Sequence, residues 1–333
     1  KGIIIMHIAI VGATGNLGQD VIDQLNALNR ANITISAFAT EKSITESFHF
    51  GDSVVNVEEV KDDSFVGTDI VVLAVPAQYI TKFAEMAVQA NAQVIDASGT
   101  LIDEGVPLVL YNSNLNDADN SKKVIVTPNP LVQQLVSVLA PLDKSADIKR
   151  VVTSTYQAVS GKGKNAIAEL FEQSAALLGG QEHMEISQFS TQIGFNCIPA
   201  TSEFIGEHTR EEIQVSTQTQ ILMHKQFPVS ATCVQIPTFI GYSQAVSIEF
   251  NNHIDATKVR QILELSDNVK ILDNPKNDEF STPYGAAETN HIYVSRVRKD
   301  ISNPNTINLW IVADNLQLSA LNIVNIITKL SSH

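Results

Sequence analysis

A glycine-rich segment near the amino terminus has the residue types and spacing of a dinucleotide-binding loop. It consists of Gly12-Ala13-Thr14-Gly15-Asn16-Leu17-Gly18, directly after an aliphatic run and directly before a helical pattern. Gly12 permits a tight turn, Gly15 lets the backbone approach a pyrophosphate, and Gly18 allows close packing of the helix on the strand. The N–H groups at the start of the helix would bind the diphosphate. A turn that merely requires glycines is the alternative interpretation.

The segment after the next predicted strand bears on the choice between NAD and NADP. The acidic residue that usually binds the ribose of NAD is not obvious there. Instead, Thr40-Glu41-Lys42-Ser43 offers one cation and two hydroxyl groups. Thr40 and Ser43 are therefore candidate cofactor contacts, and the cation favours the 2′-phosphate of NADP.

Cysteine and histidine, the other residue types that often do chemistry, lack a catalytic setting. Cys197 and Cys233 each lie in an apolar, strand-like stretch, without a helix amino terminus that would lower the thiol pKa. We therefore expect both to be structural and reduced. The eight histidines have no metal-ligand spacing, so the sequence predicts no metal site.

Alternating strands and helices surround the glycine-rich segment. Strands are expected over residues 8–11, 33–39, 70–75 and 93–97, and helices over 17–28 and 79–90. Strand–helix–strand alternation requires parallel pairing through right-handed crossovers. The fold class predicted for this part is α/β, with a doubly wound parallel sheet of the Rossmann type.

The pattern changes after about residue 130. The later helices are expected over 130–142, 166–178 and 315–330, and the strands over 150–159, 229–236, 245–250, 291–298 and 306–312. The last two strands should form a hairpin across Ser302-Asn303-Pro304-Asn305. We expect an α+β domain with antiparallel strands and helices on one face.

Composition and charge set limits on the class of protein. The chain has 333 residues, of which 44% are hydrophobic and 17% charged, and this favours a folded protein of two domains. A net charge of -14 argues against nucleic acid or an anionic membrane as a partner. No apolar run approaches the ~18 residues of a membrane span. The expected location is the cytoplasm.

Ordered sequence matches along nearly the whole chain resemble the aspartate-semialdehyde dehydrogenase family. They include the glycine-rich segment and a strand and turn containing Ser154-Thr155-Tyr156-Gln157-Ala158-Val159-Ser160-Gly161. The remaining matches are Phe195-Asn196-Cys197-Ile198-Pro199, Val229-Ser230-Ala231-Thr232-Cys233-Val234 and Asp314-Asn315-Leu316.

The resemblance implies a division of labour between two domains. An NAD(P)-binding Rossmann domain would span residues 1–130 and be completed by the carboxyl-terminal helix, 315–333. An α+β domain over 131–314 would supply the substrate site and pair two copies into a homodimer. Ser160, Gly161 and Asn315 would join the glycine-rich segment as nucleotide contacts.

Chemistry in the family, as the resemblance implies it, begins with a cysteine thiolate that attacks the aldehyde. Hydride then moves to NADP, and phosphate attacks the thioester. In this chain the nucleophile's motif aligns with Thr127-Pro128-Asn129-Pro130, so that Pro130 occupies the cysteine's position. Tyr242 replaces the histidine base, and Gln235 replaces the arginine that binds the substrate carboxylate. Asn129 and Gln157 are retained pocket residues.

Further family positions also differ. Leu101 stands for a phosphate-binding arginine, and Ala74-Val75-Pro76-Ala77 replaces a glycine-rich nicotinamide loop. The family's helical lysine and glutamate fall near Ile213 and Thr217. Losing the nucleophile, the base and the cationic anchors together leaves no path for the family reaction.

Three hypotheses about function follow. The favoured one is a catalytically inactive relative of the dehydrogenases that keeps the fold and a weak affinity for NADP. The alternatives are an NAD(P)-dependent oxidoreductase acting on a different substrate and a purely interacting dimerisation module. The small-molecule ligand or protein partner is left open.

Overall fold

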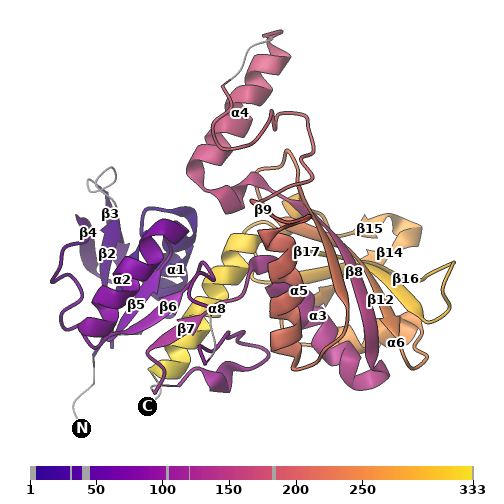
Figure 1. Cartoon of the computed structure of the whole chain (residues 1–333), viewed down its shortest axis with the longest axis horizontal. Helices are drawn as coiled ribbons and strands as arrows, with labels where there is room; N and C mark the ends of the chain where they lie inside the picture. The colour runs from indigo at the N-terminus through magenta and orange to yellow at the C-terminus, as the bar shows by residue number, and fades with distance from the viewer. Residues whose placement is uncertain are drawn as a thin grey trace. The chain divides into compact units, whose positions relative to one another are not determined.

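The protein consists of two compact units (Figure 1). The computed structural model describes residues 5–30, 32–39, 46–102, 105–119, 121–181 and 185–331. Unit 1 contains Lys1–Asn129 and Ser319–His333, and unit 2 contains Pro130–Leu318. In the described part of the chain, no helix is long and apolar enough to cross a membrane.

Unit 1 contains a seven-stranded sheet in the order β3-β4-β2-β1-β5-β6-β7. The strands are β1 (Met6–Val11), β2 (Ile33–Ala39), β3 (Ser47–Phe50), β4 (Ser53–Glu59), β5 (Ile70–Leu73), β6 (Gln93–Asp96) and β7 (Val124–Val126). All neighbours pair in parallel except β3 and β4, which are antiparallel. The doubly wound parallel sheet is confirmed, whereas β3, β4 and β7 were not predicted.

Helices cover both faces of this sheet, which explains the continuous aliphatic strands. On one face, Ile8 and Ile10 pack with Val21 of α1 (Asn16–Ala27) and Ile323 of α8 (Asn315–Leu330). On the other face, β1 packs against α2 (Ala77–Gln89), where Ile80 is fully buried. Each strand of the sheet centre therefore has no solvent-facing side.

Unit 2 contains a six-stranded sheet in the order β11-β8-β12-β17-β16-β13. Its strands are β8 (Ile148–Gln157), β11 (Val229–Gln235), β12 (Tyr242–Phe250), β13 (Val269–Ile271), β16 (Ile292–Lys299) and β17 (Thr306–Ala313). The hairpin of β16 and β17 is confirmed. The expectation of antiparallel strands is confirmed for β8–β12, β12–β17 and β16–β17, but it is wrong for β11–β8 and β13–β16, which pair in parallel. The long helical connection between β8 and β11 returns the chain to the starting end, as a parallel pair requires.

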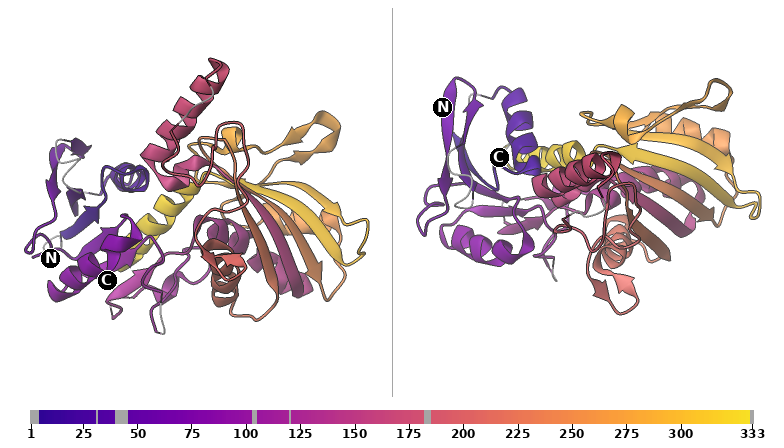
Figure 2. Two further views of the ribbon diagram at one scale, coloured as in Figure 1. Left: turned by 45° about the horizontal axis from the view of Figure 1, so that its top comes forward. Right: turned by 90° about the horizontal axis from the view of Figure 1, so that it is seen from above.

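Three helices lie along one face of this sheet: α3 (Pro130–Ala146), α5 (Arg210–Met223) and α6 (Ala256–Glu264) (Figure 1). By contrast, α4 (Lys164–Leu178) projects away from the sheet (Figure 2). The smaller elements of unit 2 are β9 (Phe204–Ile205), β10 (His208–Thr209), β14 (Asp273–Asn274), β15 (Glu279–Phe280) and α7 (Pro283–Ala286).

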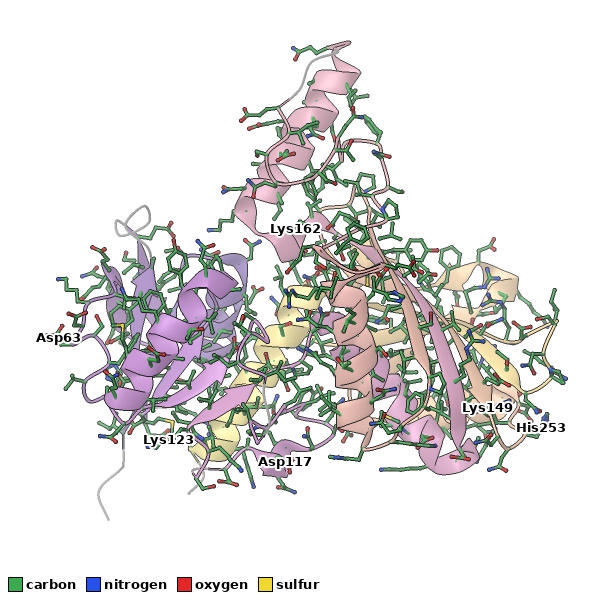
Figure 3. The ribbon with its side chains drawn as sticks, in the orientation of Figure 1. Asp63, Asp117, Lys123, Lys149, Lys162 and His253 are labelled. Atoms are coloured by element: carbon green, nitrogen blue, oxygen red, sulfur yellow. The ribbon has the colours of Figure 1, made fainter. Side chains whose placement is uncertain are left out.

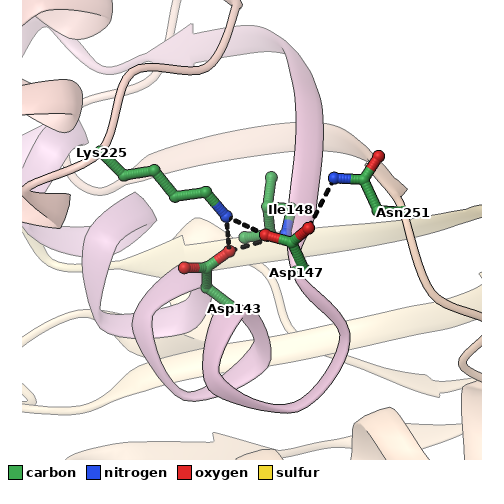
Figure 4. Close-up of polar contacts among 5 residues, drawn as sticks. All are labelled: Asp143, Asp147, Ile148, Lys225 and Asn251. Atoms are coloured by element: carbon green, nitrogen blue, oxygen red, sulfur yellow. Dashed lines mark hydrogen bonds and ion pairs between the residues drawn. The ribbon is translucent and has the colours of Figure 1, made fainter.

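An ion-pair network ties α3 to the first residues of β8 (Figure 4). The ammonium of Lys225 donates to Asp143 at 2.7 Å and also to Asp147. Asp143 in turn accepts from the backbone N–H of Ile148, and Asn251 donates to Asp147 at 2.6 Å. The network thus fixes the turn at which helix α3 becomes strand β8.

Candidate functional site

The glycine-rich segment connects β1 to α1, as the sequence predicts, and its three glycines have different surroundings. Gly12 has a φ of +91°, and a Cβ there would lie 2.2 Å from the carbonyl oxygen of Ala74. A Cβ at Gly18 would lie 2.2 Å from the carbonyl oxygen of Gly12. The fold itself therefore requires Gly12 and Gly18.

Gly15 differs, because the fold leaves space around its α-carbon. It is the N-cap of α1, with a φ of −75°, and the nearest atom to an added Cβ is the Gly12 carbonyl oxygen at 3.2 Å. No side chain caps the helix there. The N–H groups of the first turn and the open space at Gly15 together suit the approach of a diphosphate.

The other candidate nucleotide contacts are divided between the units. Ala13 is buried, and Thr14, Asn16 and Leu17 are partly exposed in unit 1. In unit 2 the Ser160 hydroxyl donates to Asn315 Oδ1 at 3.1 Å, which brings two of the predicted residues together. Thr40 and Ser43 lie outside the described residues.

Pro130 is the first residue of α3, directly after the half-buried Asn129. This is the end of a helix at which a thiolate would be stabilised by the N–H groups and the helix dipole. Proline has neither a nucleophilic atom nor an N–H group. The helix begins without difficulty, since proline suits its first turn.

Gln157 and Gln235 lie opposite each other in the parallel β8–β11 pair and are both almost fully buried. The Gln235 amide donates to the backbone oxygen of Gln157 at 2.6 Å. The Gln157 amide donates to Thr155 Oγ1 at 3.1 Å and to Glu211 Oε2 at 3.2 Å. We call Thr155, Gln157, Thr201, Glu211 and Gln235 the polar cluster, because the Thr201 hydroxyl also donates to Glu211.

Glu211 is a site residue that sequence reasoning missed. It lies in the first turn of α5, the helix on which the resemblance places the family's lysine and glutamate, near Ile213 and Thr217. A capping box starts this helix: Thr209 accepts from the Glu212 N–H, and the Glu212 carboxylate accepts from the Thr209 N–H at 2.8 Å. A threonine followed three residues later by glutamate is readable from sequence and could have located the first residue of α5.

Tyr242, at the start of β12, packs its side chain against the turn that holds Gly161. A Cβ added at Gly161 would fall 1.8 Å from the tyrosine hydroxyl oxygen, so the ring leaves no room there. Burial, and secondly the negative charge of Glu211, raise the pKa of the Tyr242 hydroxyl far above its ordinary value. Tyr242 therefore stays protonated and cannot act as a base near neutral pH.

The two cysteines differ more than the sequence suggested. Cys233 is fully buried in β11, where burial and then the charge of Glu211 raise the pKa of its thiol. Such a thiol is inert as a nucleophile. Cys197 lies in a loop and is exposed, so the expectation of a strand-like setting for it is wrong.

Lys162 is the cation that the structure brings next to the polar cluster. It lies near the base of α4, at the other end of unit 2 from Lys149 and His253 (Figure 3). Its ammonium donates to the backbone oxygen of Thr201 at 2.8 Å and lies 6.0 Å from the centre of the Phe189 ring.

Unit 1 carries acidic surface residues such as Asp63 (Figure 3). Among the described residues, no group of three or more His, Cys, Asp or Glu side chains could hold a metal ion.

Known proteins that resemble this chain do so along almost its entire length. Residues 7–121 match the semialdehyde dehydrogenase NAD-binding domain, and residues 139–318 match the semialdehyde dehydrogenase dimerisation domain. Aspartate-semialdehyde dehydrogenase of Rickettsia conorii is 35% identical over 329 residues, covering 97% of each chain. The enzyme of Campylobacter jejuni is 34% identical over 330 residues, covering 97% of this chain and 96% of the relative.

Solved structures agree with this assignment. The structure of aspartate semialdehyde dehydrogenase II from Vibrio cholerae complexed with ASA has a TM-score of 0.92 and 32% sequence identity, with 97% of both chains covered. The chain therefore belongs to the aspartate-semialdehyde dehydrogenase family.

Proposed function

We propose that this chain is a nucleotide-binding member of its family that does not catalyse the family reaction. The observation that carries the proposal is the polar cluster, in which the Gln235 amide donates to the backbone of Gln157. An arginine at position 235 would present a cationic fork to a substrate carboxylate. The neutral amide of Gln235, which already donates to the backbone oxygen of Gln157, cannot bind a substrate carboxylate in the same way.

The chain also lacks a nucleophile and a general base for the remaining steps of the reaction. Covalent catalysis requires a nucleophile at the amino terminus of α3, where Pro130 has none. Proton transfer requires a base whose pKa lies near the working pH, whereas the pKa of Tyr242 is raised by burial. Cys233 cannot take over the nucleophile's role, because burial raises the pKa of its thiol too.

Residual nucleotide binding is led by the diphosphate half of NADP. Gly15 has the open space that a diphosphate needs, and the N–H groups of the first turn of α1 lie beside it. The nicotinamide half is weaker, because Ala74-Val75-Pro76-Ala77 stands where the family has glycines. Each lost close or ionic contact costs about 1–3 kcal/mol, so affinity falls by tens to thousands of fold without vanishing.

The proposed assembly is a homodimer formed through unit 2. One face of its sheet is covered by α3, α5 and α6, and the opposite face carries side chains such as Val152 and Tyr156. Val152 is 37% exposed, and two-fold pairing is the commonest way to cover such a face. The functional domains proposed are residues 1–130 with the helix 315–333, and residues 131–314.

Calorimetric titration with NADP, NAD and ADP-ribose tests this function. We expect NADP and ADP-ribose to bind weakly and with similar affinity, because the nicotinamide adds little to the binding free energy. An affinity for NADP much higher than for ADP-ribose would contradict the account of the nicotinamide side. No binding of any nucleotide would favour the interaction-module interpretation instead.

A further inference from the structure

A cavity of about 350 Å³ lies at the edge of the unit 1 sheet where the parallel strands β1, β5, β6 and β7 begin. The glycine-rich segment follows β1 and therefore lies at the opposite edge, where open α/β sheets bind nucleotides. Every described lining residue of the cavity belongs to unit 1, so the face of unit 2 that a second copy is proposed to cover has no part in it. The cavity is thus separate from both of those sites.

The order of the strands separates two opposite charges across this cavity. Asp69 directly precedes β5, and Lys122 and Lys123 directly precede β7. Strand β6 lies between them, and neighbouring strands lie about 4.8 Å apart, so the α-carbons of the acidic and basic residues are roughly 10 Å from each other. Among the residues that the structure describes, none of these three side chains forms an ion pair. The cavity therefore has an acidic side and a basic side.

The basic side is held in place by Gln93, the first residue of β6. Its side-chain amide donates to the backbone oxygens of Asp119 at 2.8 Å and Lys122 at 2.6 Å, which fixes the turn before β7. Both amide hydrogens are then used, so the side-chain carbonyl oxygen is the group of Gln93 that can accept from a ligand. Lys122 also helps to lower the pKa of the Asp119 carboxyl, after the hydrogen bonds from Ser121. Lys123, at the end of unit 1 where α8 ends, is therefore the less compensated of the two lysines (Figure 3).

The acidic side is fixed too, and an apolar wall adjoins it. Asp69 Oδ2 accepts from the backbone N–H of His7 at 2.7 Å, which holds the carboxylate beside the start of β1. The apolar lining residues are Met6 at the start of β1, Ile70 at the start of β5 and Leu330 at the end of α8. A ligand here can pair a positive group with the carboxylate and still place an aliphatic part on these side chains.

The two charges select the ligand. A simple anion would be repelled by Asp69 and a simple cation by the lysines, whereas a molecule with one ammonium and one carboxylate satisfies both sides at once. We propose that this cavity binds an aliphatic amino acid. Its ammonium lies toward Asp69 and Gln93 Oε1, its carboxylate toward Lys122 and Lys123, and its side chain against the apolar wall. A volume of about 350 Å³ is enough for a molecule of this size, and the proposal does not depend on whether the chain catalyses the family reaction.

Titration calorimetry on the full chain tests the site with one amino acid and two analogues that each lack one charge. L-Leucine carries both charges, 4-methylpentanoate lacks the ammonium, and 3-methylbutylamine lacks the carboxylate. We expect saturable binding of leucine, with each analogue at least about tenfold weaker, because a charge-assisted contact is lost. Glycine, which keeps both charges without the aliphatic part, should also bind more weakly than leucine.

Variants that remove one charge tell which side of the cavity binds which group. Lys123→Gln should weaken leucine binding about tenfold or more and reduce the preference for leucine over 3-methylbutylamine. Asp69→Asn keeps an oxygen for the His7 N–H, and it should reduce the preference for leucine over 4-methylpentanoate. The matched controls are Lys82→Gln on α2 and Asp63→Asn, at exposed positions of unit 1 outside the cavity, and they should bind leucine as wild type does.

The proposal is overturned if leucine gives no saturable binding, or if either analogue binds as tightly as leucine. It is equally overturned if Lys123→Gln and Asp69→Asn both bind leucine as wild type does, or if the two control variants weaken binding as much as they do. Far-UV circular dichroism and urea unfolding of each variant ensure that a loss of binding is not a loss of fold.

Discussion

In the glycine-rich segment, the glycine that the fold requires, Gly12, differs from the glycine that a bound diphosphate would require, Gly15. Replacing Gly12 by alanine imposes a positive φ on an L-residue, which costs about 1–2 kcal/mol. It also sets a Cβ 2.2 Å from the Ala74 carbonyl oxygen, an overpacking that costs about 1–3 kcal/mol more. Gly12→Ala should therefore lower the free energy of unfolding by several kcal/mol.

Replacing Gly15 by alanine should affect the ligand and spare the fold. Its φ of −75° is open to any residue, and the nearest atom to the new Cβ is 3.2 Å away, so a shift of a few tenths of an ångström suffices. The loss of a favourable N-cap residue costs about 1 kcal/mol or less. The methyl group, however, occupies the space through which a diphosphate would approach, and Gly15→Val occupies more of it.

Urea unfolding followed by circular dichroism, together with calorimetry on ADP-ribose, measures both effects. We expect Gly15→Ala to unfold close to wild type and to bind ADP-ribose at least about tenfold more weakly, with Gly15→Val abolishing binding. Wild-type affinity for ADP-ribose in both Gly15 variants would refute the reasoning and leave the segment a purely structural turn. A Gly12→Ala variant as stable as wild type would refute the assignment of Gly12.

Three further predictions concern stability and assembly. Lys225→Met should lower the free energy of unfolding by about 1 kcal/mol, because Asp143 loses its ion pair. Lys149→Met, which breaks a more exposed ion pair, should lower the free energy of unfolding by less, and equal losses in urea unfolding would contradict this. Hydrogen bonds from Ser302 and Asn308 hold the pKa of Asp300 below its ordinary value, and those from Lys225 and Asn251 do the same for Asp147. Because the native pKa values are lowered, the stabilisation by these two carboxylates is fully present above the unfolded pKa of about 3.9 and is lost as the pH falls through the native values. The urea midpoint should therefore drop in acid, and it should drop less in Asp300→Asn than in wild type. Light scattering should give twice the 36.2 kDa of one chain, and a monomer at micromolar concentration would count against the homodimer.

The parts of the fold that local sequence determines were predictable, and the parts that depend on distant contacts were not. Buried aliphatic strands and the glycine turn located the parallel sheet of unit 1, because its strands are covered on both faces. The direction of β11 relative to β8 could not be read from its alternating pattern, which is the same in parallel and antiparallel pairs. The short β3 and the largely exposed β4 lack an aliphatic run and were missed.

For the candidate site, the sequence supplied a hypothesis about positions and no information about contacts. By resemblance, Pro130, Gln235 and Tyr242 are predicted to stand where the family has reactive groups, and this stays a prediction. The sequence did not indicate that the Gln235 amide donates to the backbone of β8 or that Tyr242 fills the space over Gly161. Those facts depend on strand register and side-chain direction. Glu211 was missed although a helix was expected around Ile213 and Thr217, because its contacts with Gln157 and Thr201 depend on how that helix packs.

The central claim, that the chain does not catalyse the family reaction, is tested most directly by one turnover measurement. Purified protein is incubated with aspartate semialdehyde, phosphate and NADP, and the formation of NADPH is followed by its absorbance. The account predicts no reduction above the blank without protein, because we propose that Pro130, Tyr242 and Gln235 stand in place of the nucleophile, the base and the carboxylate anchor. Turnover near 1 s⁻¹, about the low end of ordinary enzymes, would contradict it.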